Sequence, residues 1–158
     1  PFLNYFVKFL RNRSFLDLLD KNSIYFTEAK AKSELLKEIC NFAANNYNLN
    51  EKELYLEVLR REQLLSTGLQ NHLAIPHAKF SVSSPYVVIA VSKNGIEFDS
   101  IDGLPAKVIV FLITPIGESD LQLNLLAEIA SKLGKPNVID KIVSMNTNQD
   151  IINLLTKI

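Results

Sequence analysis

The sequence predicts one α/β domain, in which helices pack on a largely buried β-sheet. Two segments, 86–92 (YVVIAVS) and 107–114 (KVIVFLIT), are continuous, apolar and β-branched, which is typical of strands buried on both faces. Around them, apolar residues recur at helical spacing over about 31–45, 50–62 and 119–133. A chain of 158 residues, 47% hydrophobic and 22% charged, is long enough for one core and too short for two domains.

Residues 1–13 (PFLNYFVKFLRNR) differ from the rest of the chain. Phe2, Phe6 and Phe9 recur at helical spacing, and the charged residues among them are all basic. This pattern predicts either an amphipathic helix that packs on the domain or a basic segment at a membrane, including the end of a membrane helix. We therefore divide the chain into an N-terminal extension, 1–13, and a domain, 14–158.

Charge and cysteine content exclude several classes of protein. Seventeen basic and seventeen acidic residues give a formal net charge of zero, which removes a general electrostatic drive toward nucleic acid. The single cysteine excludes an internal disulfide and a cysteine metal cage, and it favours a reducing, cytoplasmic setting. Cys40 lies on the apolar face of the first predicted helix, as expected of a small buried residue rather than a nucleophile.

Residues typical of helix caps and turns predict where the remaining helices and strands begin and end. Asn50 can cap the second helix, with Glu53 three residues later as in a capping box. Lys93-Asn94-Gly95 predicts a turn after the first strand, and Asp102-Gly103 predicts another turn before the second. The helix over 119–133 ends at a glycine, and two short helices follow, over 137–144 and from Thr147 onward.

His77 is the most informative polar residue of the chain. It follows Pro76, which has no N–H for a sheet ladder, so a strand over 73–77 ends here or lies at a sheet edge. A histidine at a strand end of an α/β sheet is either structural or a general base, ligand or nucleophile. His72 is five residues away, which would put the two rings on opposite faces of a strand. The spacing disfavours a two-histidine metal site.

A basic pair closes the second predicted helix, ahead of His77. Arg60 and Arg61 can form an ordinary solvated helix end, because cations are favourable at a helix C-terminus. Alternatively, one arginine reaches an anion held at His77, because a guanidinium binds phosphate through paired N–H donors. The turn Ser66-Thr67-Gly68 would bring the helix and the histidine together.

The motifs Arg61-Glu62, Ser66-Thr67-Gly68 and Ala74-Ile75-Pro76-His77, at this spacing, resemble the signature of a known family. It comprises the fructose/mannitol-type enzyme IIA domains of the bacterial phosphoenolpyruvate-dependent sugar phosphotransferase system. The resemblance runs from about residue 14 to residue 158. It implies a mixed central sheet flanked by helices on both faces.

The resemblance also implies a function. His77 would accept a phosphoryl group from the histidine-containing phosphocarrier protein and pass it to a IIB domain. Arg61 would lie at this site, and we place Thr67 beside it as a neighbour of the phosphoryl group. The chemistry requires no metal and no organic cofactor, because the protein positions the groups and stabilises charge on the transferred group.

Gln122 departs from the family pattern. Members often carry a second histidine at this position, ahead of a Leu-Leu-Ala run that is Leu125-Leu126-Ala127 here. We expect Gln122 in the first turn of the helix over 119–133, within reach of the phosphoryl group. An amide never becomes cationic, so we expect onward transfer to be slower than acceptance.

Three functional interpretations follow. The first is a phosphoryl carrier in sugar uptake. The second is a regulatory domain that resembles nitrogen-regulatory enzyme IIA and is fused to a membrane transporter. A short resemblance of residues 1–8 to the end of the last membrane helix of cation/proton antiporters favours such a fusion. The third is a degenerate domain that only binds partners.

Overall fold

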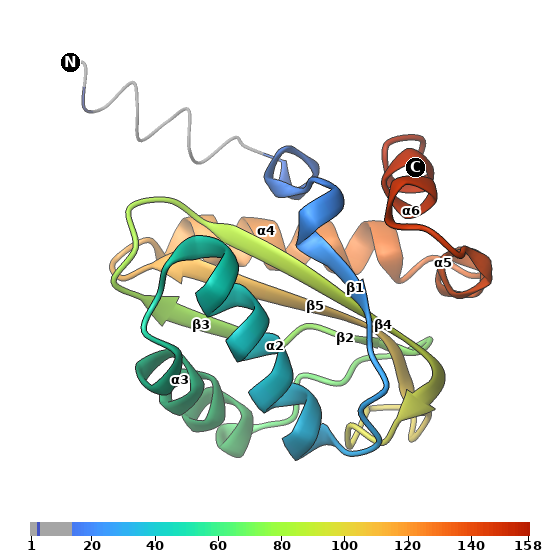
Figure 1. Cartoon of the computed structure of the whole chain (residues 1–158), viewed down its shortest axis with the longest axis horizontal. Coiled ribbons are helices and arrows are strands. Elements are labelled where there is room, and N and C mark those ends of the chain that lie inside the picture. Colours follow the sequence, from blue (N-terminus) through green and yellow to red (C-terminus); the bar gives the residue numbers. More distant parts are fainter. Residues whose placement is uncertain (1–2, 4–13) are drawn as a thin grey trace.

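A five-stranded sheet forms the centre of the computed structural model, which describes Leu3 and residues 14–158 (Figure 1). The strands are β1 (Ile24–Phe26), β2 (Leu73–Ala74), β3 (His77–Phe80), β4 (Tyr86–Ile96) and β5 (Ala106–Pro115). Their order is β1-β4-β5, with β2 and β3 both paired to the other edge of β5. β4 and β5 are antiparallel, and the other pairs are parallel. The sheet is therefore mixed, as expected.

Helices cover both faces of this sheet, which confirms the predicted fold class (Figure 1). One face is covered by α2 (Lys32–Tyr47) and α3 (Glu51–Leu64). The other face carries α4 (Ser119–Leu133), α5 (Val138–Ser144), α6 (Asn148–Leu155) and the 3-10 helix η1 (Phe15–Leu18). A second short 3-10 helix, η2 (Lys21–Ser23), leads into β1.

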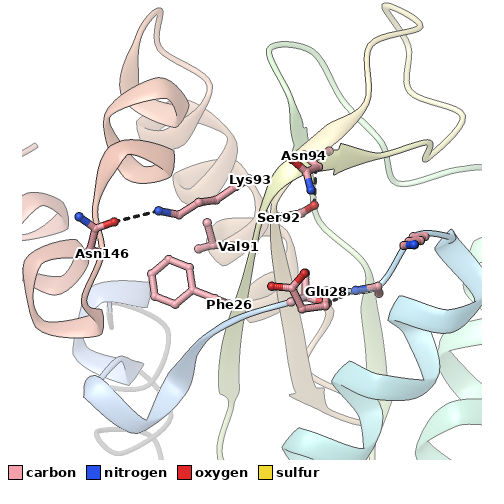
Figure 2. A pocket seen from close by; sticks show the side chains of 11 residues that line it. Phe26, Glu28, Val91, Ser92, Lys93, Asn94 and Asn146 are labelled. Atoms are coloured by element: carbon pink, nitrogen blue, oxygen red, sulfur yellow. Dashed lines mark hydrogen bonds between the residues drawn. The ribbon is translucent and has the colours of Figure 1, made fainter.

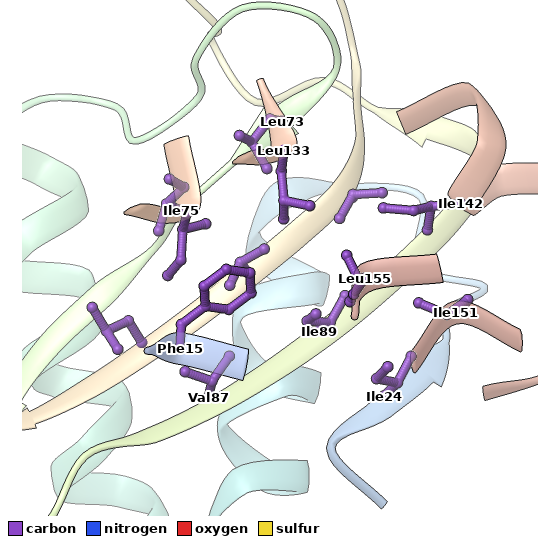
Figure 3. Packing of buried hydrophobic residues seen from close by; sticks show 14 of the residues in the cluster. Phe15, Ile24, Leu73, Ile75, Val87, Ile89, Leu133, Ile142, Ile151 and Leu155 are labelled. Carbon is purple, nitrogen blue, oxygen red and sulfur yellow. The ribbon is translucent and has the colours of Figure 1, made fainter. Parts of the chain in front are cut away.

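The core is divided into two parts by the sheet. Alternate residues of β5 point to opposite faces, so Val110 and Leu112 pack under α4 to α6 while Ile109 and Phe111 pack under α2 and α3. Figure 3 shows the first part, in which Phe15 packs beside the strands. Both predicted apolar strands are thus buried on both faces, because each face has its own helical layer.

Local signals place the helix ends where the sequence predicts them. Asn50 Oδ1 accepts the N–H of Glu53 at 3.0 Å, and α3 begins directly after it. The Thr147 hydroxyl accepts the N–H of Asp150 at 3.1 Å and begins α6 in the same way. Cys40 is fully buried in α2, and this burial raises the pKa of its thiol to about 12, so the thiol is unreactive at neutral pH.

The turn predicted at Lys93-Asn94-Gly95 is wrong, because these residues lie inside β4. The strand instead contains a bulge, and its register against β5 shifts between Val91 and Ile96. Ser92 Oγ accepts the N–H of Gly95 at 3.1 Å, and Gly95 adopts a φ of 83°. The turn-forming residues bend the strand locally, and Ile96 then pairs again with β5.

The extension predicted over 1–13 lies outside the described residues, apart from Leu3. The domain predicted after it starts with an anchored residue, since the N–H of Phe15 donates to Glu128 of α4 at 2.6 Å. Among Leu3 and residues 14–158, every helix is too short or too polar to cross a lipid bilayer.

Candidate functional site

His77 is the first residue of β3, at the edge of the sheet (Figure 1). The sequence predicts that the strand ends at this point or lies at a sheet edge, and the structure shows the edge position. Pro76 separates two short edge strands: β2 ends at Ala74, and β3 begins at His77. His77 pairs with Leu112 of β5, whose side chain lies in the core under α4. The imidazole is therefore on the face of the sheet that α4 covers.

Two hydrogen bonds define the tautomer of the His77 ring. Nδ1 lies 2.8 Å from the carbonyl oxygen of Ile75, which can only accept, so Nδ1 carries the proton and donates it. The Nε of Arg61 donates to His77 Nε2 at 3.2 Å, so Nε2 holds a lone pair. Both contacts agree on a neutral ring whose free nucleophilic atom is Nε2.

The surroundings of His77 favour this neutral form. Burial is the largest effect and lowers the pKa of the ring below its usual value, and the nearby Arg61 and Lys79 lower it further. The carbonyl of Ile75 and the carboxylate of Glu62 oppose this shift without reversing it. At neutral pH the ring is therefore unprotonated at Nε2 and able to attack an electrophile.

Arg61 is the arginine of the basic pair that reaches His77. It lies in the last turn of α3, and besides its contact with the ring it donates from NH1 to the carbonyl of Leu65 at 2.7 Å. Arg60 points elsewhere: its side chain is 73% exposed and forms an ion pair with Glu57 at 3.2 Å. The structure thus supports a site role for Arg61 and the ordinary helix-end role for Arg60.

Glu62 brings a buried carboxylate to the same turn of α3. Its side chain is only 4% exposed and forms an ion pair with Lys32 of α2 at 3.0 Å. It also accepts the backbone N–H of Thr67 at 3.0 Å and the Thr67 hydroxyl. Thr67 lines the same pocket as His77, but its hydroxyl donates to Glu62, and its place beside a phosphoryl group stays a prediction. The sequence did not reveal this use of Glu62, since it occupied an ordinary helix end.

A pocket of about 590 Å³ opens beside His77 and Arg61. Apolar side chains from three separate segments rim it: Leu65 is 73% exposed, Ile101 71% and Leu123 62%. Exposed apolar residues grouped around a polar site are typical of protein–protein contact. The sequence carried a signal for this rim, because Leu65 and Ile101 are apolar residues at a helix end and a turn.

A second pocket, of about 500 Å³, lies at the opposite edge of the sheet beside β1 (Figure 2). Phe26 and Lys93 line it, and Lys93 Nζ donates to Asn146 Oδ1 at 3.0 Å. Of the described residues that line this pocket, none is a histidine or a cysteine. This second pocket therefore offers no nucleophilic imidazole among the residues that line it.

The structure places Gln122 in the first turn of α4, as predicted. Its amide, however, donates from Nε2 to the Thr114 hydroxyl of β5 at 3.1 Å, and the side chain is buried. The next residue, Leu123, lines the His77 pocket instead. That Gln122 reaches a phosphoryl group on His77 stays a prediction.

His72 lies apart from this arrangement. Its Nδ1 is 2.7 Å from the carbonyl oxygen of Pro105, at the start of β5, so that ring nitrogen has a structural partner. This agrees with the expectation that His72 is an ordinary polar residue and that the two histidines do not act as a pair.

Comparison with known proteins identifies the family of this domain. Residues 17–158 match the family model described as phosphoenolpyruvate-dependent sugar phosphotransferase system, EIIA 2. The chain belongs to this family. The EIIA 2 match covers both elements that hold the site residues, α3 and β3, together with the pocket around them.

Relatives of this EIIA domain fall into two groups. It is 28% identical over 144 residues to the PTS system fructose-specific EIIABC component of Bacillus subtilis, covering 89% of this chain and 23% of that protein. It is also 28% identical over 130 residues to a nitrogen regulatory protein of Pseudomonas aeruginosa, covering 81% of this chain and 84% of that protein. The chain thus spans under a quarter of the fructose-specific relative. One of these two relatives is named as fructose-specific, and the other is named as nitrogen-regulatory.

Solved structures share the fold. Nitrogen regulatory protein IIA-Ntr from Neisseria meningitidis aligns with a TM-score of 0.83 at 22% identity, over 89% of this chain and 98% of that one. Enzyme IIA mannitol from Escherichia coli, solved in complex with phosphorylated enzyme IIB mannitol, aligns with a TM-score of 0.75 at 17% identity, over 89% and 98%. EIIA domains of this fold therefore include one that partners with a IIB domain.

Proposed function

We propose that this domain accepts a phosphoryl group on Nε2 of His77 from the phosphohistidine of the phosphocarrier protein and passes it to a IIB domain. The observation that carries this proposal is the ring itself. The His77 ring is neutral and lines the pocket, and its Nε2 lone pair lies next to the guanidinium of Arg61.

The transfer follows from these contacts. The Nε2 lone pair attacks phosphorus, and the N–P bond of the donor histidine breaks, which returns an electron pair to the donor ring. The ring of His77 gains positive charge in this step, because Nδ1 keeps its proton. The carbonyl of Ile75, 2.8 Å from Nδ1, stabilises that charge. The reverse sequence hands the group to the next acceptor.

Arg61 provides electrostatic stabilisation of the transferred phosphoryl group. In the free domain its Nε donates to Nε2, so this contact must open when phosphorus arrives. The guanidinium then lies beside the new group, where its N–H donors can hold the equatorial oxygens on which charge accumulates. In phosphoryl transfer such positioning and charge stabilisation are the protein's main contribution.

The rim of Leu65, Ile101 and Leu123 supports protein partners over a small substrate. A partner that donates or accepts the phosphoryl group must bring its own reacting atom close to Nε2 of His77. An apolar rim excludes water from the contact and leaves the charged centre dry. The phosphocarrier protein as donor and the IIB domain as acceptor both fit this requirement.

A regulatory role, in which phosphorylation at His77 controls another protein such as a membrane transporter fused to or bound by this domain, is the second candidate. It is favoured by the similarity to a nitrogen regulatory protein and by Gln122, whose amide is engaged with Thr114. Under this interpretation the phosphorylated form persists because onward transfer is slow.

The experiment that tests the proposal is phosphorylation in solution. The chain is incubated with phosphoenolpyruvate, enzyme I and the phosphocarrier protein, and its intact mass is measured. We expect one added phosphoryl group, lost in His77→Ala and retained in the control His72→Ala. A phosphoryl group that survives in His77→Ala would overturn the assignment.

A further inference from the structure

We propose that Glu62 is a positioning residue for phosphoryl transfer, which acts through the 65–67 loop to orient both the His77 ring and the Arg61 guanidinium. This inference rests on the proposed function. Among the described residues, the hydrogen bonds and ion pair of Glu62 go to Thr67 and Lys32 and not to His77, so its action on the ring must pass through other groups.

The first route runs from Glu62 to the His77 ring through two intervening residues, Thr67 and Ile75. The carboxylate accepts the N–H and the hydroxyl of Thr67. The carbonyl of Thr67 then accepts the N–H of Ile75 at 3.1 Å. The carbonyl of Ile75 in turn accepts from His77 Nδ1 at 2.8 Å. The group that fixes the tautomer of His77 is thus held in place from Glu62.

The second route runs to the guanidinium. Arg61 NH1 donates to the carbonyl of Leu65 at 2.7 Å, two residues before Thr67. When Nε releases His77 to admit the phosphoryl group, this carbonyl remains as the tether of the guanidinium. The position of the Leu65 carbonyl is fixed by the Glu62–Thr67 contact. Glu62 therefore controls where the guanidinium lies relative to the oxygens of the transferred group.

The burial of Glu62 makes this arrangement rigid. A carboxylate that is 4% exposed is costly unless it is paired, and Lys32 Nζ compensates its charge at 3.0 Å. Lys32 also lies 3.3 Å from Ser66 Oγ and 4.7 Å from the centre of the Phe98 ring, so the cation is itself held in one place. These contacts therefore hold the last turn of α3 and the loop after it in one arrangement.

The charges around His77 make the pKa of its ring a measurable indicator of the state of Glu62. Arg61 on α3 and Lys79 on β3 lower the pKa of His77, whereas Glu62 on α3 raises it. Asp99, from the segment after β4, lines the same pocket but is largely exposed to solvent. Glu62 partly offsets the effect of the two cations on the ring. When its negative charge is removed, the pKa of His77 should therefore fall further.

The test uses Glu62→Gln in the full chain, because glutamine keeps the shape and one acceptor while it removes the charge. We expect a lower His77 pKa in an NMR titration, a shifted Arg61 Nε–H resonance, and phosphorylation about tenfold slower. A displacement of about 1 Å can cost roughly 100-fold, and the retained amide oxygen limits the loss. The control Glu57→Gln, on an exposed face of α3, should leave all three unchanged.

The outcomes separate the two proposals. If Glu62→Gln folds and leaves the His77 pKa and the Arg61 resonance unchanged, or changes them without slowing phosphorylation, Glu62 is not a positioning residue. If Glu62→Gln does not fold, the variant Thr67→Val tests the same inference. It removes the hydroxyl contact alone, and an unaltered Arg61 resonance would overturn the inference. If the unchanged chain is never phosphorylated, the proposed function fails, while the two NMR measurements still decide whether Glu62 orients these groups.

Discussion

Replacing Arg61 with alanine should slow the phosphorylation of His77 far more than it destabilises the fold. The side chain makes two hydrogen bonds, one to the His77 ring at 3.2 Å and one to the carbonyl of Leu65 at 2.7 Å. Leu65 is largely exposed, so water can replace the lost donor at its carbonyl. We therefore expect a stability change within about 0.5 kcal/mol, as for other surface positions.

The rate effect is larger because the guanidinium acts on charge that develops during transfer. A hydrogen bond to a charged group is worth about 1.5–3 kcal/mol, which corresponds to about one to two decades in rate. Arg61 also lowers the pKa of His77, so its loss returns that pKa toward the usual value. At pH 7.5 most rings remain neutral in either case, so this second effect is small. Arg61→Lys should recover only part of the rate, because an ammonium group lacks the planar fork.

The assay is single-turnover transfer from the phosphorylated phosphocarrier protein, quenched at intervals and followed by intact mass. Arg60→Ala is the matched control, since Arg60 is the neighbouring arginine and is exposed in an ion pair with Glu57. It should retain the rate, as exposed pairs contribute little. A large effect of Arg60→Ala together with none for Arg61→Ala would refute the assignment.

Two further predictions concern pH and Gln122. The folded state lowers the pKa of His77 below about 6.5, its unfolded value, so the folded chain binds fewer protons and loses stability as pH falls through that value. The melting temperature of the unchanged chain should therefore drop more between pH 7.5 and pH 5.5 than that of His77→Gln, and equal drops would contradict the burial of a neutral ring. Gln122→His should speed transfer to a IIB domain by about tenfold or less, as one added charged hydrogen bond permits. Unaltered rates of both acceptance and onward transfer would remove Gln122 from the site.

The position of Gln122 shows how a departure from the family pattern is accommodated. A neutral amide finds a neutral partner, the Thr114 hydroxyl, and so ties the first turn of α4 to β5. This contact is buried, and a histidine placed here would have to break it or share it. Gln122→His would therefore change the packing of α4 against the sheet as well as the charge in the first turn of that helix.

Elements whose signals are local and repeated could be predicted from the sequence. The strands β4 and β5 were predictable because both of their faces are apolar, and α3 and α6 because side-chain caps start them. His77 stood out because a proline precedes it. The residues alone left its role open, and the family motif selected phosphoryl acceptance.

The contacts between groups that are distant in the sequence depend on the tertiary packing and could not be predicted in this way. β1 has three residues and no periodicity of its own, so it exists only because β4 offers it a parallel edge. Arg61 and His77 are sixteen residues apart, and their contact depends on how α3 packs against β3. The same holds for Glu62, whose partner Lys32 comes from the start of another helix. Periodicity reports which face of an element is buried, whereas the contacts of a buried polar atom depend on the packing of the whole core.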